Sequence, residues 1–368
     1  MTPPKRPARP LPRRRGARHA LVTGGAGFIG ANLAHRLASQ GRRVLVLDSL
    51  ARAGVKHNLA WLKAVHGDLV AAQVADVRDA RAVADAVRGA DMVFHLAAQV
   101  AVTTSVADPR TDFEVNAAGT LNVLEAVRGL DAPPPLVFTS TNKVYGKLGD
   151  LALVEQATRY APADAGVAWQ GVSEDRPLDF YSPYGCSKGA ADQYVLDYAR
   201  IYGLPAVALR MSCIYGPHQC GTEDQGWVAH FLISAMEGRG LTIFGNGKQV
   251  RDVLWVEDLV DAFLLAVEHI GSLRGKAFNI GGGPGNSVSL VELLAMMRDL
   301  GLPPAVVAHG QGRPGDQAWF VADTRGFGRV TGWRPRTGVA QGVAALAEWL
   351  GERRLADGGQ SRAKEANS

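Results

Sequence analysis

The sequence predicts an α/β protein with a doubly wound parallel sheet and a smaller C-terminal substrate-binding lobe. Short buried strands alternate with helical patterns from His19 to Arg210, which is typical of parallel sheets with helices on both faces. Beyond Arg210 the alternation breaks up, and glycines such as Gly216, Gly221 and Gly226 separate short segments. The change of pattern indicates a second, less regular lobe.

The first strand and helix carry the most informative motif. His19–Thr23 reads as a buried strand, Gly24, Gly27 and Gly30 follow at once, and a helical pattern begins there. The next strand closes on Asp48, 24 residues after Gly24. Such glycines let the backbone approach a pyrophosphate at a helix N-terminus, and an acid at this place binds ribose hydroxyls. The pattern predicts a Rossmann unit for NAD, because Asp48 would repel the 2′-phosphate of NADP.

The alternation then continues along the chain. Ligands of such sheets bind beyond the carboxyl ends of the strands. The stretch between Tyr145 and Ser182 lacks clear periodicity, and a connection of that length usually builds a site or a lid. Further strands are expected to end at Asp76, Ala97, Ser140 and Arg210, with helices over 79–88 and 111–128 and, in the second lobe, over 227–237, 258–269, 289–300 and 339–350.

Composition and charge exclude several classes of protein. The chain of 368 residues is 47% hydrophobic and 20% charged, and no apolar run approaches the ~18 residues that span a membrane. Three cysteines (Cys186, Cys213 and Cys220) are too few for a disulfide framework and indicate the cytoplasm. Cys213, Cys220 and the nearby His218 lack a fourth ligand, so no metal is expected.

The net charge of +5 arises from the N-terminus, where seven lysines and arginines lie within the first 18 residues. The rest of the chain is therefore slightly acidic, which argues against nucleic-acid binding. The sequence predicts four parts: a disordered basic tail (1–18), an NAD-binding domain (19–210), a substrate-binding lobe (211–350, of which about 251–283 partly returns to the first domain) and a flexible tail (351–368).

Tyr184 and Lys188 are the leading catalytic candidates. Ser182 suits a helix N-cap and Pro183 the first helical position, and the helix is expected to run to Tyr202 before Gly203. Residues four apart share a helix face. An ammonium about 4 Å from a phenol favours the phenolate by about 4 kcal/mol, enough to move a tyrosine pKa from about 10 towards 7. Such a phenol can act as a general base towards a sugar hydroxyl.

Taken together, these residues resemble the extended short-chain dehydrogenase/reductases that act on nucleotide sugars. The resemblance covers about 19–345 and rests on the glycine turn, Asp48, Asp76, His95-Leu-Ala-Ala98, Ser140-Thr141, the Tyr184/Lys188 pair and Tyr215-Gly-Pro217. The segments 140–146, 182–193, 223–227 and 247–252 are most similar to the CDP-tyvelose (CDP-paratose) 2-epimerase branch.

The resemblance implies tightly bound NAD and inversion of C2 of a CDP-linked hexose by reversible oxidation. Tyr184 would be the base, Lys188 would bind the nicotinamide ribose, and Thr141 would hydrogen-bond the reacting hydroxyl beside Asn142. Arg251 and Arg313 fall where phosphate-binding arginines lie, and a homo-oligomer (dimer or tetramer) is expected. The residues expected to line the cofactor are Gly24, Gly27, Phe28, Ile29, Gly30, Asp48, Asp76, Val77, Leu96, Ala97 and Ala98, with Tyr184 and Lys188.

Three positions depart from relatives. Sugar dehydratases carry Asp-Glu after the catalytic threonine, whereas this chain has Asn142 and Lys143 and so lacks their acid and base. Many relatives have asparagine where Cys213 stands. Two alternatives stay open: a nucleotide-sugar 4-epimerase of the UDP-glucose type, and a non-catalytic dinucleotide sensor. The second is disfavoured, because such sensors usually lose the tyrosine or the lysine.

Overall fold

The computed structural model describes residues 18–222, 224–303, 306–312 and 316–365, with only the backbone of 355–365. The predicted basic tail lies outside these residues except for Arg18. No helix within the described ranges is long and apolar enough to cross a membrane.

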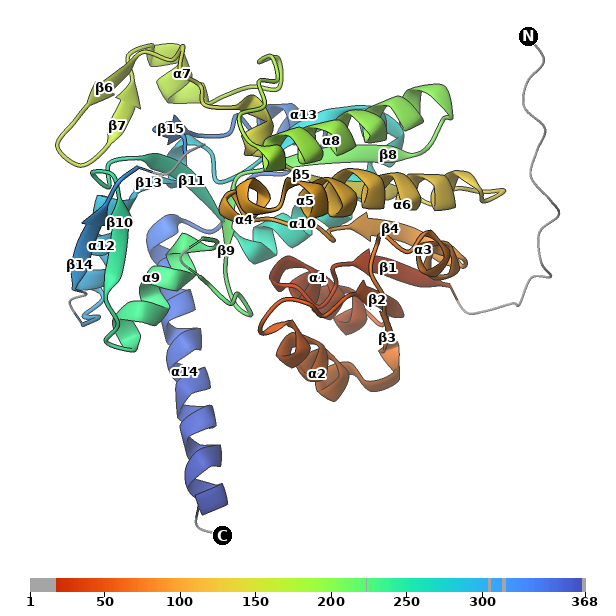
Figure 1. Ribbon diagram of the computed structural model, residues 1–368, viewed down its shortest axis with the longest axis horizontal. Helices are drawn as coiled ribbons and strands as arrows, with labels where there is room; N and C mark the ends of the chain where they lie inside the picture. The colour runs from red at the N-terminus through yellow and green to blue at the C-terminus, as the bar shows by residue number, and fades with distance from the viewer. Residues whose placement is uncertain (1–17, 223, 304–305, 313–315, 366–368) are drawn as a thin grey trace.

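A seven-stranded parallel sheet forms the centre of the molecule (Figure 1). Its strand order is β12-β8-β5-β4-β1-β2-β3, which confirms the predicted doubly wound sheet. The last of its seven strands along the chain, β12, joins the edge of the sheet after the chain has passed through much of the second lobe. The strands are β1 (His19–Thr23), β2 (Val44–Asp48), β3 (Val70–Val74), β4 (Ala90–His95), β5 (Leu136–Thr141), β8 (Ala206–Met211) and β12 (Ala277–Ile280).

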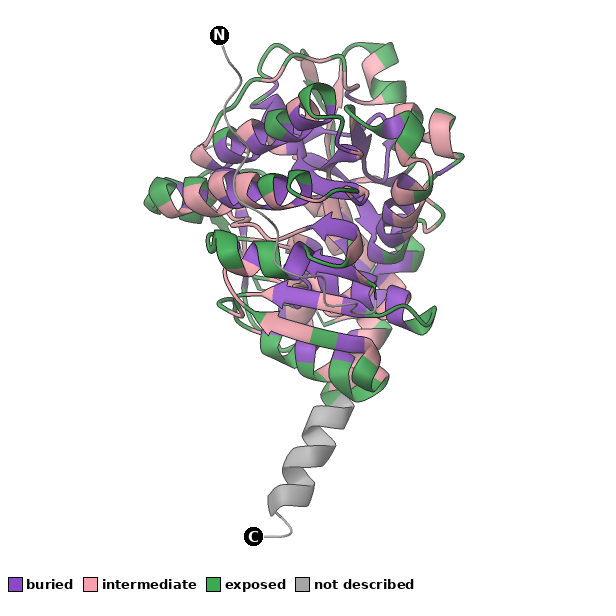
Figure 2. Ribbon diagram, turned by 90° about the vertical axis from the view of Figure 1, so that its right-hand side faces the viewer, coloured by how far each residue is buried: buried purple, intermediate pink, exposed green. Residues whose placement is uncertain are grey.

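Alternate residues of these strands enter two separate hydrophobic cores, one on each face. Val22 and Phe94 pack with one set of helices, whereas Leu21 and Val93, their chain neighbours, pack with the other. Figure 2 shows the buried strands between the helical layers. The first core holds α1 (Phe28–Ser39), α2 (Val55–His66), α10 (Val256–Glu268), α11 (Ile270–Leu273) and α13 (Arg325–Thr331); the second holds α3 (Ala80–Val87), α6 (Gly119–Arg128) and α8 (Pro183–Ile201).

The helix predicted over 111–128 is present, but it contains a π-helical turn. The chain forms α4 (Val102–Ala107), α5 (Pro109–Phe113), a π-helical turn (Glu114–Ala118) and then α6. A π turn accommodates an extra residue, and such turns concentrate at functional sites. Here it contains Asn116, whose side chain is 1% exposed and bonds to three other segments.

The second lobe surrounds a small mixed sheet in which β11 pairs with β9, β13 and β15. The four helices predicted after Trp227 are all present. Its elements are β9 (Cys213–Tyr215), α9 (Trp227–Met236), β10 (Leu241–Phe244), β11 (Val250–Trp255), β13 (Ser287–Ser289), α12 (Leu290–Asp299), β14 (Val307–Gly310), β15 (Trp319–Phe320) and α14 (Val339–Glu365), with the short turns η1 (Gly67–Leu69), η3 (Asn142–Tyr145) and η4 (Pro284–Asn286) elsewhere in the chain.

Two segments contain elements that the sequence did not predict. The chain between Tyr145 and Ser182, which lacks clear periodicity, forms β6 (Leu153–Glu155), β7 (Tyr160–Pro162) and α7 (Ala165–Gln170). The backbone of the helix predicted over 339–350 continues as α14 to Glu365, and the flexibility predicted from 351 stays a prediction. Glu352, Arg353 and Arg354 are strong helix formers, which a single glycine before them does not interrupt.

A buried ion pair joins α8 to the sheet. Arg210 donates to both carboxylate oxygens of Asp192, at 3.0 and 2.9 Å, and to the hydroxyl of Tyr145 at 3.0 Å. That hydroxyl in turn donates to Asn279 on β12 at 2.8 Å. A bidentate pair of this kind has a fixed geometry. It therefore holds α8, which carries Tyr184 and Lys188, in register with β8 and β12.

Candidate active site

The glycine turn lies between β1 and α1, and each glycine has a different role. Gly24 has φ +68°, and a Cβ there would lie 2.7 Å from the backbone nitrogen of Ala97. A Cβ on Gly30 would lie 2.3 Å from the Gly24 carbonyl oxygen, so Gly30 allows the helix to pack on the turn. Within the described residues, a Cβ on Gly27 would meet only that same oxygen, at 3.1 Å. The space above Gly27 is open, as a bound pyrophosphate requires.

The N-terminus of α1 is suited to an anion. Gly27 is its N-cap, no side chain caps it, and its first turn contains no acidic residue. The backbone N–H groups of the first turn, which include Phe28 and Ile29, thus keep their capacity to donate to a ligand.

Asp48 lies at the carboxyl end of β2, next to this turn. Its Oδ2 accepts from the backbone N–H of Ala26 at 3.0 Å, and its Oδ1 accepts from that of Leu50 at 2.8 Å. Each carboxylate oxygen has a further lone pair. The carboxylate is therefore held in place and can still accept hydrogen bonds from ribose hydroxyls.

Asp76 and Val77 follow β3 but differ in exposure. The Asp76 carboxylate accepts from Arg78 at 2.9 Å, and this hydrogen bond lowers the pKa of Asp76 below its usual value. Val77 is buried against Gly119, where a Cβ would lie 2.8 Å from the Val77 side chain. Both residues lie at the sheet edge that the sequence predicted, although the Asp76 side chain is engaged by Arg78.

A buried chain of hydrogen bonds supports the segment Leu96–Ala98. The backbone N–H of Ala97 donates to Thr23 Oγ1 at 3.2 Å, and this hydroxyl contacts His95 Nδ1 at 2.7 Å. The other ring nitrogen of His95 lies 3.0 Å from Thr120 Oγ1. Burial lowers the pKa of His95 to about 3, so the ring is neutral. His95 thus fixes the strand end and does not act as an acid.

Helix α8 begins as the sequence predicted. Ser182 Oγ accepts from the backbone N–H of Gly185 at 3.0 Å, and the helix ends at Ile201 with Tyr202 as its C-cap. The phenol of Tyr184 shares a hydrogen bond with the side chain of Thr141, at the end of β5. The structure therefore brings the predicted base and the predicted threonine together.

The predicted phenol pKa near 7 is wrong for the chain by itself. Burial raises the pKa of Tyr184 to about 12, and the hydrogen bond with Thr141 offsets only part of the rise. Burial also lowers the pKa of Lys188 to about 7, against the opposing carboxylates of Asp192 and Asp112. The sequence argument assumed a charged lysine near the phenol and left out burial, which disfavours charge on both groups.

The ammonium of Lys188 has a distinctive environment. Its Nζ lies 4.2 Å from the centre of the Phe138 ring, and the residue is 2% exposed. Across the described ranges the structure records no hydrogen-bond acceptor for this group. A buried ammonium without an acceptor is costly, and ribose hydroxyls would satisfy it.

Behind α8 lies a network that the sequence reasoning missed. Ser187 Oγ donates to Asp112 Oδ2 at 2.5 Å, and Asn116 Nδ2 donates to Ser187 Oγ at 3.0 Å. Ser105 Oγ accepts from the backbone N–H of Tyr184 at 3.1 Å. Ser105, Asp112 and Asn116 lie in α4, α5 and the π turn, and no local motif marks them. Together with Ser187 they position the first turn of α8.

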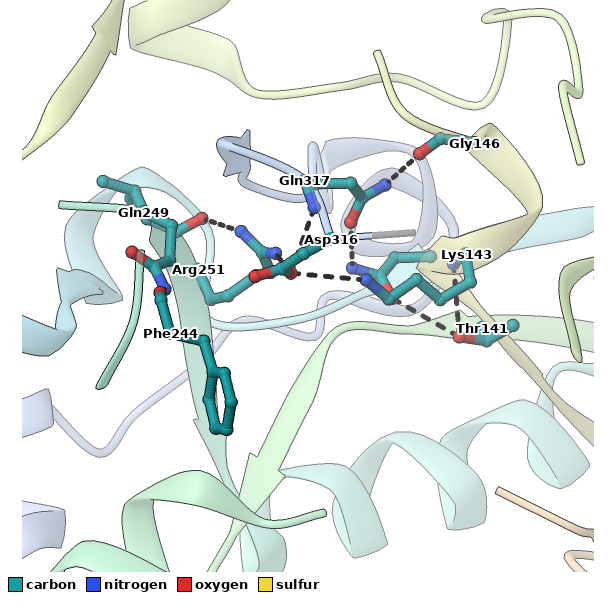
Figure 3. A network of polar contacts seen from close by, with 10 residues as sticks. Thr141, Lys143, Gly146, Phe244, Gln249, Arg251, Asp316 and Gln317 are labelled. Atoms are coloured by element: carbon teal, nitrogen blue, oxygen red, sulfur yellow. Dashed lines mark hydrogen bonds and ion pairs between the residues drawn. The ribbon is translucent and has the colours of Figure 1, made fainter. Parts of the chain in front are cut away.

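The part of the site next to Thr141 is built from three distant segments (Figure 3). The Thr141 hydroxyl lies 3.3 Å from Asn142 Oδ1, and Asn142 Nδ2 lies 3.4 Å from Gln317 Oε1. Arg251, on β11, is 7% exposed and donates to Asp316 Oδ1 at 2.5 Å. Gln317 and Asp316 were not predicted. The other predicted phosphate-binding arginine, Arg313, lies outside the described residues.

Three features of the chain fit NAD: the open space above Gly27, the held carboxylate of Asp48 and the buried ammonium of Lys188. They lie at one edge of the sheet, where the strands end. A sequence profile of the NAD dependent epimerase/dehydratase family matches residues 20–281. The chain belongs to this family.

Other members are similar along nearly their whole length. A CDP-paratose 2-epimerase of Salmonella typhi is 44% identical over 342 residues, which cover 89% of this chain and 98% of the relative. The structure of a Thermus thermophilus UDP-glucose 4-epimerase in complex with NAD has a TM-score of 0.75 and 33% identity over 90% of this chain and 98% of the other. A Streptomyces venezuelae dTDP-glucose 4,6-dehydratase with NAD bound has a TM-score of 0.77 and 29% identity, with coverages of 92% and 98%.

In this NAD dependent epimerase/dehydratase, the groups that fit NAD and the groups around Thr141 and Arg251 form two halves of the site, which come from different parts of the fold. NAD is the cofactor of the family, and the groups that fit it lie on one edge of the sheet. The groups near Thr141 and Arg251 come from the second lobe and from η3. Among them, Asn142 and Lys143 stand where sugar dehydratases carry their Asp-Glu acid–base pair.

Proposed function

We propose that this protein inverts C2 of a CDP-linked hexose through a 2-keto intermediate, with NAD as a permanently bound cofactor. The observation that carries the proposal is the pairing of Tyr184 with Thr141 next to a segment that lacks a carboxylic acid. The 44% identity to a CDP-paratose 2-epimerase supports both the reaction and the substrate.

The chemistry follows from the sugar. A C–H bond beside a hydroxyl is not acidic, so an epimerase must first oxidise the carbon. Bound NAD would supply the acceptor for the hydride of C2 and the donor for its return. Oxidation also releases the hydroxyl proton, which Tyr184 accepts and later gives back, so that the residue ends each cycle unchanged. Thr141, already hydrogen-bonded to the phenol, orients the reacting hydroxyl.

For this role, the phenol pKa must fall from about 12 when the site fills. Lys188, four residues further along the same helix, supplies the positive charge that can lower it. The same ammonium would also bind the ribose of the cofactor. Its two tasks explain why a lysine stands at a position where burial disfavours charge.

Residues 142 and 143 decide between epimerisation and elimination. Loss of water requires a proton donor and a base beside the oxidised carbon. Asn142 has no titratable proton, and Lys143 offers an ammonium instead of a carboxylate. The keto sugar is therefore retained until hydride returns to its other face, which requires the sugar to turn while the diphosphate stays anchored at Arg251.

Isotope tracing tests the proposal. The purified protein is incubated with CDP-hexoses that carry deuterium at C2, in H₂O. Inversion at C2 with the deuterium kept in the sugar is the expected result, whereas an enolising mechanism would lose it to solvent. UDP-glucose serves as the comparison substrate. Epimerisation at C4, or a clear preference for the UDP sugar, would replace this proposal by the 4-epimerase alternative.

A homo-oligomer and a cytoplasmic location also remain proposals. Large apolar side chains are exposed on α5 and α8: Phe113 at 57%, Tyr194 at 46% and Ile201 at 63%. These helices lie side by side in Figure 1 and contact each other. An exposed apolar surface of this kind suits a self-complementary interface. Light scattering on the purified chain would give the number of subunits.

A further inference from the structure

The chain between β9 and α9 leaves the second lobe and packs against the NAD-binding domain (Figure 1). We name its residues Pro217–Gly221 the strap. The carbonyl oxygen of Pro217 accepts from Asn32 Nδ2 on α1 at 2.9 Å. The carbonyl oxygen of His218 accepts from Asn58 Nδ2 on α2 at 3.2 Å. The backbone of the strap is thus fastened to two helices of the NAD-binding domain.

Asn58 connects the strap directly to the glycine turn. Its side chain is buried, and the same Nδ2 also donates to the carbonyl oxygen of Ala26 at 3.2 Å. Ala26 lies within the turn, and its own N–H donates to Asp48. A side-chain amide has two N–H donors, and here one serves the turn and the other serves His218. The strap therefore lies next to the turn that fits a pyrophosphate.

The ring of His218 provides a further contact with α2. It stacks on Trp61, with ring centres 3.8 Å apart and planes 29° from parallel. Trp61 also contacts His35 on α1, with ring centres 5.0 Å apart. Burial lowers the pKa of His218 to about 4, so the ring is neutral at pH 7. The ring is therefore an apolar anchor for the strap.

The far end of the strap lies against the segment that follows Asp48. Cys220 packs on Gly54, where an added Cβ would lie 2.2 Å from Cys220 Sγ. A few residues beyond the strap, Gln225 Oε1 accepts from Nη2 of Arg52 at 2.5 Å. The strap therefore reaches from the glycine turn to the neighbourhood of Asp48, and both of these features fit NAD.

The backbone of the strap is strained at its anchor. His218 has a φ of +66°, in the left-handed region that few residues other than glycine adopt. Such a conformation costs free energy and persists only where the surroundings hold it. Asn58 and Trp61 hold it here. When these contacts open, His218 is free to relax to an ordinary φ, so the release of strain favours detachment.

We propose that the strap closes the cofactor site, and that NAD enters and leaves only when His218 detaches from Asn58 and Trp61. The inference rests on the proposed function in one respect, that NAD stays bound between turnovers. An epimerase consumes no NAD, but loss of the reduced cofactor between the two hydride transfers would leave a keto sugar behind. A fastened strap prevents this loss. The structure thereby gives Asn32, Asn58, Trp61 and His218 a role in cofactor retention.

The rate of NAD exchange tests the proposal without any sugar present. Protein loaded with labelled NAD receives an excess of unlabelled NAD, and filtration measures the label that remains bound over time. His218→Gly removes the anchoring ring and suits the φ of +66°, so release should become about tenfold faster. Asn32→Ala removes one hydrogen bond to the strap and should speed release about fivefold. His57→Ala, at an exposed position on α2, is the control.

Uptake of NAD distinguishes a strap from a simple contact with the cofactor. Because detachment precedes both entry and exit, His218→Gly should also take up NAD about tenfold faster after the protein has been stripped of it. Faster release without faster uptake would show that the segment only contacts bound NAD, and would overturn the proposal. Unchanged release in both His218→Gly and Asn32→Ala, with melting temperatures near that of the parent, would overturn it as well.

A disulfide across the strap tests the opposite direction. A Cβ at residue 54 would lie 3.3 Å from Cys220 Cβ, close to the ~3.5–4.5 Å that disulfides span. In Gly54→Cys, oxidation to the cross-linked form should slow NAD release at least tenfold, and reduction should restore it. The reduced form of the same variant is the baseline, which removes the effect of backbone strain at residue 54. Gly54→Cys combined with Cys220→Ser should not respond to oxidation.

Release from the cross-linked protein at the rate of its reduced form would show that NAD leaves by another path, and would overturn the proposal. Exchange of NAD needs no turnover, so failure of the C2 reaction and failure of this inference can be told apart.

Discussion

The two halves of the candidate site are built in different ways. On the cofactor side, most groups come from one stretch, Gly24–Gly30, and from Asp48 at the end of the neighbouring strand, and Lys188 is added by α8. On the sugar side, Lys143, Arg251 and Asp316 come from segments far apart in the chain and meet only through β11 and the loop before β15.

The difference has a physical reason. The cofactor side depends mainly on backbone geometry. Gly24 has a left-handed conformation, Gly30 lets α1 pack closely on the turn, and the first N–H groups of α1 have no side-chain cap. The sugar side works with charged side chains whose positions depend on the packing of the second lobe. The first arrangement serves any member of the family, whereas the second can differ between substrates.

The largest expected effect concerns Tyr184, which lies where the two halves meet. Tyr184→Phe should reduce turnover by about 10²–10⁴, the usual cost of losing a general base, and leave both NAD and CDP bound. Turnover is followed by product analysis, and NAD by assay of the acid-precipitated protein. Tyr194→Phe, on an exposed part of the same helix, is the control. Near-normal turnover in Tyr184→Phe would leave the site without its base.

Replacement of Asp192 should have the next largest effect. It should destabilise the fold and therefore both halves of the site. Its carboxylate is 0% exposed and holds Arg210 in a bidentate pair. Breaking such a pair leaves a buried charge and typically costs about 3–5 kcal/mol. Asp192→Ala should lower the free energy of unfolding by that amount in urea titrations. The exposed Asp197, which pairs with Arg200 on the same helix, should change it by less than ~1 kcal/mol when replaced.

Much of the cofactor side could be predicted because its signals are local. The strand His19–Thr23, the three glycines and the helix α8 with its Ser182 cap all lie where the sequence placed them. Each depends on neighbours within a few residues, such as a cap or a missing Cβ. The alternation of strands and helices along the chain likewise predicted the parallel sheet, because a strand–helix–strand unit places its two strands parallel.

The remainder depends on contacts that no local pattern records. The π turn around Asn116 forms because its side chain bonds to Gln99, Asp112 and Ser187. The phenol pKa was predicted wrongly because burial could not be seen from the spacing of Tyr184 and Lys188. Asp316 was missed because a lone aspartate in a loop carries no signal until Arg251 is packed against it.

Replacement of Asp48 should have a smaller effect, which should be confined to the affinity for NAD. Hydrogen bonds to a charged group contribute about 1.5–3 kcal/mol, so Asp48→Ala should weaken NAD binding roughly 10- to 100-fold. CDP affinity should not change, because Asp48 lies at the end of β2, away from Arg251. Competition titrations on stripped protein measure both ligands, with the exposed Asp68→Ala as control. A loss of CDP binding of similar size would show that the two halves are coupled.

The smallest effect should be a pH dependence confined to the sugar side. The pKa of Lys143 is lowered to about 8 in the free chain, so its ammonium is lost as the pH rises through that value. A diphosphate anchored at Arg251, whose guanidinium acts on Lys143, would favour the charged form of Lys143 and raise this pKa, so CDP binding takes up a proton near pH 8. CDP affinity should therefore be highest below pH 7 to 8 and fall several-fold towards pH 9.5. The terminal phosphate, with a pKa of about 6, is already ionised there and adds little slope.

Lys143→Met separates this effect from other titrations. The variant should bind CDP more weakly than the parent at pH 7 but with an affinity that no longer depends on pH between 7 and 9.5. Cytidine, which carries no phosphate, should show no such dependence with either protein. If the slope persisted in Lys143→Met, another group would be taking up the proton. The pH dependence of CDP binding would then have to be assigned to a residue other than Lys143.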